Sequence, residues 1–326
     1  MSKTEKLIIA IPSKGRLQEN TQGFFEKLGL KIKRSQGARG YSGELIGIDN
    51  VEIAFLSASE IAKALDEGLV HLGITGEDLL RENIRNTNQK VEILNPLGFG
   101  RANVIVAVPQ SWIDVNNMLD LDEVANRFRD DHGRRLRIAT KYNSLTTEFF
   151  ASHGIENYRL VASAGATEGA PASGSAELIV DITSTGSTLA ANNLKILSDG
   201  VILRSEANLT LAFTANWGTN QLNALEKLLN LTAAEQSARQ IQEINCSANN
   251  LSTDQINMLV DTFNCQLPFG NKPTDKLTIL ADKTQIFEIV DYLKAAGSKF
   301  ITVSDLKYIF NHDNKKFGQI VKKLKN

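Results

Sequence analysis

The sequence predicts an α/β protein of two lobes around a central cleft, followed by a C-terminal α+β domain. Short apolar runs typical of buried strands, such as residues 7–12, alternate with stretches of helical spacing, such as residues 17–28. Alternation of this kind indicates parallel strands joined by right-handed helical crossovers. After Gln221 the pattern changes to longer helical stretches and a small sheet, which indicates a separate domain.

We expect the first lobe to contain residues 1–100 and 206–221. Ser57 follows an apolar run and can cap a helix that continues to Glu67. A further turn, at residues 75–78, leads from a strand into the next helix. The predicted strands of this lobe are residues 7–12, 51–56 and 70–74.

The second lobe is expected at residues 101–205. Apolar strands at 201–205 and 209–214 would return the chain to the first lobe. The other predicted elements are strands at 103–108, 136–139 and 178–182, and helices at 123–129 and 144–152.

The C-terminal domain is expected to span residues 222–326 and to serve subunit association or regulation. Its predicted elements are helices at 222–244, 252–263 and 284–295, strands at 276–280 and 299–303, and a basic helical stretch at 314–325. The helix at 284–295 has an apolar stripe at helical spacing, which we expect to be buried. The stripe consists of Ile286, Phe287, Ile289, Val290 and Leu293.

Composition excludes several classes of protein. The 326 residues are 42% hydrophobic and 22% charged, as in ordinary globular proteins, and the net charge of −1 argues against nucleic-acid binding. Cys246 and Cys265 are too few for a disulfide framework and lack metal-ligand spacing. With neither an export signal nor an apolar run long enough to span a membrane, we expect a cytoplasmic protein with no membrane partner.

The strongest chemical signal is the segment 177–189, in which an apolar strand leads into a loop of hydroxyl residues. Backbone N–H groups and Ser or Thr hydroxyls in such a loop can converge on a phosphate. Gly186 permits a close approach of the ligand, and Asp181 at the strand end suits the paired hydroxyls of a ribose. The alternative is a hydroxyl-rich turn that only caps a helix.

This loop does not stand alone, because five segments resemble the ATP phosphoribosyltransferases of histidine biosynthesis, in family order between Leu7 and Glu206. The resemblance is greatest to the short-form enzymes of α-proteobacteria and includes residues 55–61. The five segments are residues 14–17, 73–78, 139–142, 165–171 and 181–189.

The resemblance implies a glycosyltransferase that joins N1 of ATP to the anomeric carbon of phosphoribosyl pyrophosphate and releases pyrophosphate. It also implies a core fold like that of type II periplasmic binding proteins. Mg²⁺ would arrive on the substrate phosphates, with no fixed protein ligands. A homo-oligomer is expected, and a regulatory subunit related to histidyl-tRNA synthetase is a further partner of this family.

By the same resemblance, residue roles can be assigned. Lys14, Arg16, Arg39 and Asp181 would be catalytic; phosphoribosyl pyrophosphate would bind to Glu168, Asp181, Thr183, Ser184, Thr185, Gly186, Ser187 and Thr188; and ATP would bind to Gly73, Thr75, Gly76 and Asp78. Most of these residues have an alternative explanation. The cations at 14, 16 and 39 could be solvated loop charges, Glu168 a solvated carboxylate, and Asp78 a favourable charge in a first helical turn.

The chain also departs from the family. Where many members have an arginine and an Asp-Ile-Pro motif, this sequence has residues 57–62, Ser-Ala-Ser-Glu-Ile-Ala. Residues 276–310 resemble one half of the histidine-sensing domain of long-form enzymes, but residues 222–263 are predicted to be helical, so histidine control is left open. Two alternatives to the enzyme follow: a two-lobed anion- or solute-binding protein, and a catalytically silent regulatory paralogue.

Overall fold

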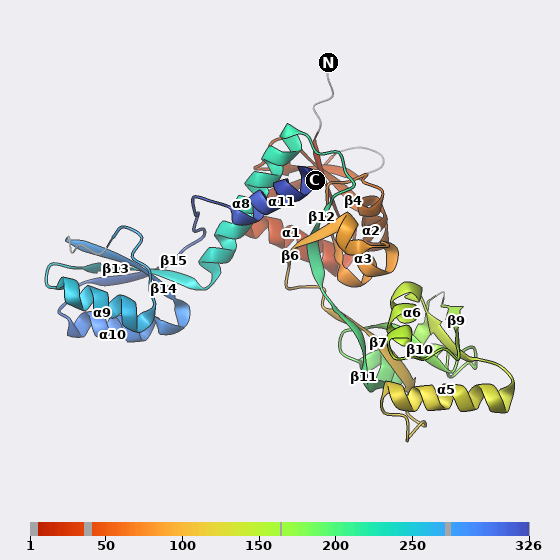
Figure 1. Cartoon of the computed structure of the whole chain (residues 1–326). Helices are drawn as coiled ribbons and strands as arrows, with labels where there is room; N and C mark the ends of the chain where they lie inside the picture. The colour runs from red at the N-terminus through yellow and green to blue at the C-terminus, as the bar shows by residue number, and fades with distance from the viewer. Residues whose placement is uncertain (1–5, 36–40, 164, 271–274, 326) are drawn as a thin grey trace, which may run out of the picture. The chain divides into compact units, whose positions relative to one another are not determined.

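The computed structural model describes residues 6–35, 41–163, 165–270 and 275–325. The chain divides into two compact units, Met1–Glu26 with Leu30–Gln221, and Lys27–Gly29 with Leu222–Asn326. The first unit is built on two sheets and the second on one (Figure 1). The predicted fold class, two α/β lobes and a C-terminal α+β domain, is confirmed.

The first lobe has a seven-stranded sheet in the order β2-β3-β4-β1-β5-β12-β6. β1 pairs in parallel with both β4 and β5, whereas β12 is antiparallel to both β5 and β6. The strands are β1 (Leu7–Pro12), β2 (Lys31–Arg34), β3 (Ser42–Ile46), β4 (Val51–Leu56), β5 (Leu72–Gly76), β6 (Val91–Pro96) and β12 (Ala207–Ala212).

Helices follow the three parallel strands of this sheet. They are α1 (Gly15–Lys27), α2 (Ala58–Asp66) and α3 (Glu77–Asn83), and the short α4 (Thr87–Lys90) precedes β6. Ser57 caps α2 as predicted, in a capping box with Glu60. Since parallel strands end at one edge of a sheet, α1, α2 and α3 all begin at that edge and turn their positive ends toward it.

The second lobe has a five-stranded sheet in the order β11-β7-β10-β8-β9. β8 pairs in parallel with β9 and β10, so their carboxyl ends also meet at one edge. The elements are β7 (Ala102–Pro109), α5 (Met118–His132), β8 (Leu136–Thr140), α6 (Asn143–Ser152), β9 (Tyr158–Ala162), the 3-10 turn η1 (Thr167–Gly169), β10 (Leu178–Thr183), α7 (Ser187–Ala191) and β11 (Leu194–Ser205). Residues 201–205 therefore belong to this lobe, and β12 alone returns to the first.

The chain crosses between the lobes twice, at residues 97–101 and at Glu206. The two crossings are bonded to each other, because Gly98 N donates to the Glu206 carboxylate at 3.1 Å and Arg101 lies 3.8 Å from it. A two-stranded crossing of this kind is a natural hinge between lobes.

An ion-pair cluster stabilises the amino end of β10, away from the phosphate loop. Glu177 accepts from Arg137 Nη2 at 2.7 Å and from Arg134 Nη2 at 3.0 Å. Burial alone would raise the pKa of Glu177, but the hydrogen bonds from Arg137 and Arg134 outweigh burial and lower this pKa to about 2. The ionised carboxylate therefore stabilises the fold.

We expect Glu177→Gln to lower the free energy of unfolding by about 2–3 kcal/mol at pH 7. Because the folded-state pKa is depressed, the contribution is complete above the ordinary value of 4.5 and is lost as the pH falls from there toward about 2. Urea unfolding at pH 7 and pH 4 measures this change, with the exposed Glu156→Gln as the control. A difference between Glu177→Gln and wild type that stays constant with pH would contradict the assignment.

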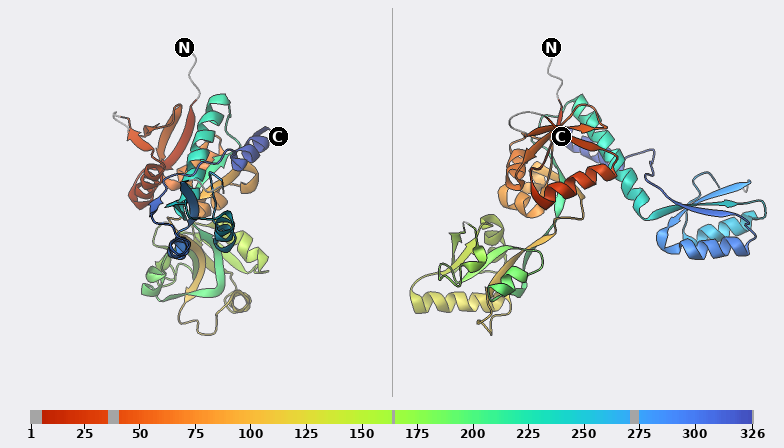
Figure 2. Two further views of the ribbon diagram at one scale, coloured as in Figure 1. Left: turned by 90° about the vertical axis from the view of Figure 1, so that its left-hand side faces the viewer. Right: turned by 180° about the vertical axis from the view of Figure 1, so that it is seen from behind.

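The second unit contains α8 (Thr219–Arg239) from Leu222 onward. Its other elements are β13 (Ile241–Ser247), α9 (Thr253–Phe263), β14 (Lys276–Asp282), the 3-10 turn η2 (Lys283–Gln285), α10 (Ile286–Ala295), β15 (Ile301–Asp305) and α11 (Lys315–Lys325). β13 lies between β14 and β15, and α9 and α10 cover one face of the three-stranded sheet (Figures 1 and 2).

Two predictions for this unit were wrong. The helix expected to continue to Ile244 ends at Arg239, because residues 241–247 form the central strand of the sheet. In the stripe of α10, Ile286, Ile289 and Leu293 are buried, but Phe287 is 83% exposed. Consecutive helical residues point about 100° apart, so Phe287 can lie outside the buried face to which Ile286 belongs.

Candidate active site

The predicted phosphate loop connects β10 to α7 in the second lobe. Gly186 has φ +75°, a left-handed conformation that favours glycine, and no atom from beyond its two chain neighbours lies within 4 Å of the place where a Cβ would be. Its N–H donates to Thr183 Oγ1 at 2.9 Å, and the hydroxyls of Thr185 and Ser187 are 2.9 Å apart. The turn is open to solvent, and its N–H groups at Gly186 and Ser187 donate to hydroxyls of the loop itself.

Exposure separates the residues of this loop into two groups. Thr183 and Gly186 are half-buried and hold the turn together through their hydrogen bond. The residues that present side chains to solvent are Ser184, Thr185, Ser187 and Thr188. An anion could therefore reach the loop from the solvent side without rearrangement of the sheet.

Asp181 lies beside the loop and is only 7% exposed. Its Oδ1 accepts from Ile182 N at 2.8 Å and lies 3.6 Å from Lys141 Nζ. Lys141 directly follows β8, whose last residue pairs with Val180, so the register of the two strands brings this cation to the carboxylate. Asp181 is thus held in place beside a cation at the carboxyl edge of the sheet.

Glu168 lies in η1, which follows β9 and precedes β10. Its neighbour Thr167 is buried and bonds to Ser163 at 2.8 Å between hydroxyl oxygens, which fixes the turn. Glu168 itself is half-buried. Glu168, Asp181 and the phosphate loop therefore all belong to the carboxyl-edge side of one sheet.

On the first lobe, Lys14 and Arg16 are exposed at the beginning of α1. A third cation, which the sequence did not reveal, joins them: Arg34 donates from Nη2 to Ser13 O at 3.0 Å and stacks 4.0 Å above the ring of Phe55. Finding Arg34 required the antiparallel pairing of β2 and β3, which the sequence analysis did not predict. Arg39 lies outside the described residues.

The predicted ATP segment is more enclosed than expected. A Cβ on Gly73 would lie 2.7 Å from Ile61 Cγ2, so this glycine is required for the packing of α2 on β5. Thr75 is buried and donates to Ala58 O at 2.9 Å, also on α2. Gly76, half-buried at the end of β5, is the N-cap residue of α3.

Asp78 is buried where the two lobes meet. It accepts from Tyr142 Oη of the second lobe at 3.0 Å and from Ser205 Oγ at 2.7 Å. Burial and the nearby Asp78 carboxylate raise the pKa of Tyr142, so its hydroxyl remains a donor at neutral pH. Asp78 is therefore bonded within the protein, and its part in ATP binding stays a prediction.

Among the described residues no cluster of three or more His, Cys, Asp or Glu side chains could hold a metal ion. No helix within the described ranges is long and apolar enough to cross a membrane.

Comparison with known proteins identifies the family of this chain. The sequence model of the family described as "HisG: ATP phosphoribosyltransferase" matches residues 57–234. A Bradyrhizobium sp. (strain ORS 278) protein named ATP phosphoribosyltransferase is 49% identical over 316 residues, covering 96% of this chain and 97% of that protein. One of the same name from Nitrobacter hamburgensis is 48% identical over 319 residues, or 97% of this chain and 98% of that protein. These matches therefore extend into residues 222–326.

A solved structure, the ATP phosphoribosyl transferase (HisG:HisZ) complex from Thermotoga maritima, contains a similar chain. The likeness has a TM-score of 0.52 and 25% sequence identity, and it covers 69% of this chain and 97% of that one.

Proposed function

The chain belongs to the ATP phosphoribosyltransferase family, and from this premise we propose how its residues divide the reaction between the two lobes. It is a glycosyltransferase of histidine biosynthesis, which joins ATP to phosphoribosyl pyrophosphate. In this reaction a bond forms between adenine N1 and the anomeric carbon, while the bond from that carbon to pyrophosphate breaks. Family membership decides against the solute-binding alternative.

The second lobe, in our proposal, binds phosphoribosyl pyrophosphate. The exposed hydroxyls of Ser184, Thr185, Ser187 and Thr188 would hold the 5′-phosphate. The N–H groups of Gly186 and Ser187, which donate to Thr183 and Thr185 within the loop, would exchange these bonds for bonds to the phosphate. Asp181 would accept from the ribose hydroxyls at Oδ2, since both of its described contacts are made by Oδ1. Glu168 would meet the same ribose or a water of hydrated Mg²⁺. The observation that carries this proposal is the position of the open loop beside Asp181, which Ile182 N and Lys141 hold in place.

The loop assignment predicts a substrate-specific effect of Thr188→Val. The variant removes one hydroxyl donor to a charged phosphate, which costs about 1.5–3 kcal/mol and so weakens phosphoribosyl pyrophosphate by about tenfold or more. ATP affinity should change less than twofold. Equilibrium titrations with each substrate measure both, and Thr147→Val, an exposed threonine of the same lobe, is the control. Equal weakening of both substrates would contradict the assignment.

The first lobe, we propose, provides positive charge for the leaving pyrophosphate and the ATP triphosphate. Lys14, Arg16 and Arg34 gather at the edge where α1 and α2 begin. Ser57 caps α2 and cannot supply the positive charge of the arginine that other family members have near this position. We therefore propose Arg34 as the replacement for that arginine. Mg²⁺ would arrive bound to the substrate phosphates and neutralise part of their charge. Arg39 remains part of the proposal on the strength of the family resemblance alone.

The turn from β5 to α3 would receive the adenine of ATP. Its backbone at Gly76 lies at the same sheet edge as the cations, and Gly73, Thr75 and Asp78 hold the turn in shape through internal packing and hydrogen bonds. In this proposal Gly73, Thr75 and Asp78 support the ATP site without contacting ATP. Gly76 is the residue of this segment that would lie nearest to ATP.

Residues 222–326 are proposed as an association or regulatory domain, in a cytoplasmic homo-oligomer. The domain has a hydrophobic core of its own beneath α9 and α10. The T. maritima structure is a complex of two different proteins, which supports a partner subunit, related to histidyl-tRNA synthetase, for this chain as well.

A direct assay tests the proposed function. The full chain is incubated with ATP, phosphoribosyl pyrophosphate and Mg²⁺, and formation of phosphoribosyl-ATP is followed by its absorbance, with and without a candidate partner subunit. Product is expected. Its absence under both conditions would favour the catalytically silent paralogue.

A further inference from the structure

The start of α6 lacks a cap from its own segment. Tyr142 occupies the N-cap position and makes no side-chain cap bond, so the first N–H groups of α6 need another acceptor. The acceptor comes from the other lobe. Glu82, on α3, accepts from Ser144 N and Leu145 N at 3.1 Å each, with one bond to each carboxylate oxygen.

This contact joins the two halves of the active site. α3 directly follows β5 and the proposed ATP turn, whereas α6 directly follows β8 and Lys141, which pairs with Asp181. A shift of α6 relative to α3 would therefore move Asp181 and the phosphate loop relative to the ATP turn.

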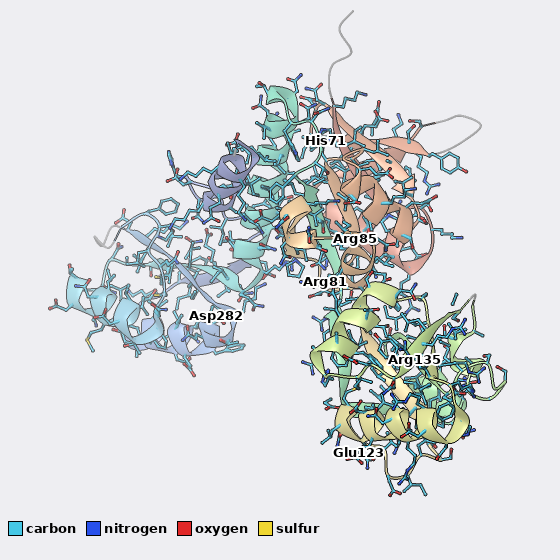
Figure 3. All side chains as sticks on the ribbon, turned by 45° about the vertical axis from the view of Figure 1, so that its right-hand side comes forward. His71, Arg81, Arg85, Glu123, Arg135 and Asp282 are labelled. Carbon is cyan, nitrogen blue, oxygen red and sulfur yellow. The ribbon has the colours of Figure 1, made fainter. Side chains whose placement is uncertain are left out.

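Two contacts of different strength hold α3 and α6 together. The bond from Tyr142 to Asp78 is buried, and Ser205 reinforces it. The contact of Glu82 with Ser144 and Leu145 is more exposed and borders an open groove of about 780 Å³. Arg81 and Arg85, which lie at the end of the first lobe nearest α6, also line this groove (Figure 3).

The chemistry of the contact suits a joint that opens and closes. Hydrogen bonds at a solvated surface exchange with water at small net cost, so such a contact can break without loss of the fold. In such a motion the buried contact between Asp78 and Tyr142 would stay closed, while the contact of Glu82 with α6 opens and closes.

We propose that Glu82 is a positioning residue, which caps α6 across the lobe boundary and thereby sets the orientation of the phosphate loop toward the ATP turn. The inference rests on the proposed division of the two substrates between the lobes. It concerns the approach of the two bound substrates, so it should affect turnover more than the binding of either substrate alone.

Glu82→Ala is the first test, in the full chain with both substrates. We expect kcat to fall about tenfold to a hundredfold, because small errors of alignment cost that much, while the Kd of phosphoribosyl pyrophosphate stays within about twofold. Glu148→Ala removes an exposed carboxylate from the same groove and should leave both quantities unchanged. The proposal would be overturned if Glu82→Ala changed kcat no more than Glu148→Ala does. It would also be overturned if Glu82→Ala weakened the binding of phosphoribosyl pyrophosphate as much as it lowered kcat.

A second variant separates positioning from simple loss of helix stability. Asn143→Asp places a negative charge in the first turn of α6, which stabilises this helix from its own segment. In the double variant Glu82→Ala/Asn143→Asp we expect the melting temperature to recover and kcat to stay low. Recovery of kcat together with the melting temperature would show that Glu82 only stabilises α6. The wild-type chain is measured in the same assay. If the wild type is active and Glu82→Ala is equally active, this inference fails while the proposed function stands; if the wild type is inactive, the proposed function fails.

Discussion

Asp181→Asn is expected to reduce kcat/KM by about two orders of magnitude and to leave the protein folded. The substitution keeps the shape and one acceptor oxygen, so the bond from Ile182 N survives. It removes the negative charge that would bind the ribose hydroxyls and face the positive charge developing on the ring carbon. Hydrogen bonds to a charged group contribute about 1.5–3 kcal/mol each, and loss of a preorganised charge at a reacting centre costs about 100-fold or more.

Two further variants test whether the loss of activity is specific to the carboxylate of Asp181. Asp131→Asn, an exposed acid on α5, controls for loss of one negative charge from the same lobe. Lys141→Met removes the cation that pairs with Asp181 but leaves the carboxylate. If Asp181 acts on the substrate, its variant should be clearly less active than Lys141→Met. If Asp181→Asn and Lys141→Met lose activity equally, Asp181 acts only as a partner of Lys141. If the melting temperature of Asp181→Asn is far below that of the wild type, its loss of activity is a structural effect.

Much of the core could be predicted because the relevant signals are local. Strand and helix alternate in the sequence with little interruption, and Ser57 and Ser252 are the N-caps of α2 and α9, each in a capping box. A cap depends on a residue and its neighbours three positions on, so it can be recognised without knowledge of the rest of the fold.

The predictions that were wrong depend on contacts between distant segments, which local sequence signals do not reveal. β13 has little strand signal of its own, and it becomes a strand because β14 and β15 pair on both sides of it. Phe287 has helical spacing with its neighbours, but which side of α10 is buried depends on where the sheet lies. Such decisions are made by tertiary packing, which can override local pattern.

The candidate site shows the same division. The phosphate loop and Lys14 are continuous with strand ends and could be predicted, whereas Arg34 and Glu82 act on segments distant in sequence. Glu82 reaches residues 62 and 63 positions away, and Arg34 reaches one 21 positions away. Gly73, which the sequence assigned to the ATP site, has a packing explanation, since its missing side chain makes room for Ile61 and Leu65.

Lys14→Met is expected to reduce kcat by about 100-fold, with a smaller effect on the binding of phosphoribosyl pyrophosphate. Pyrophosphate gains negative charge as it leaves, so a cation in contact with it stabilises the transition state more than the bound substrate. Methionine keeps the apolar length of the lysine side chain and removes its charge. Since Lys14 is exposed, the fold should not depend on it. Pre-steady-state turnover and an equilibrium titration measure the two quantities separately.

Lys27→Met is the matched control, because Lys27 is also exposed and ends the helix that Lys14 precedes. The 13 residues of α1 place the two lysines about 20 Å apart, so a long-range effect of net charge would act on both. Only a contact with the leaving group distinguishes them. Raising ionic strength should shrink any shared effect and leave the specific loss at Lys14. If the two variants lose activity equally, or if Lys14→Met weakens substrate binding as much as it slows turnover, the cation at the start of α1 does not act on the departing pyrophosphate.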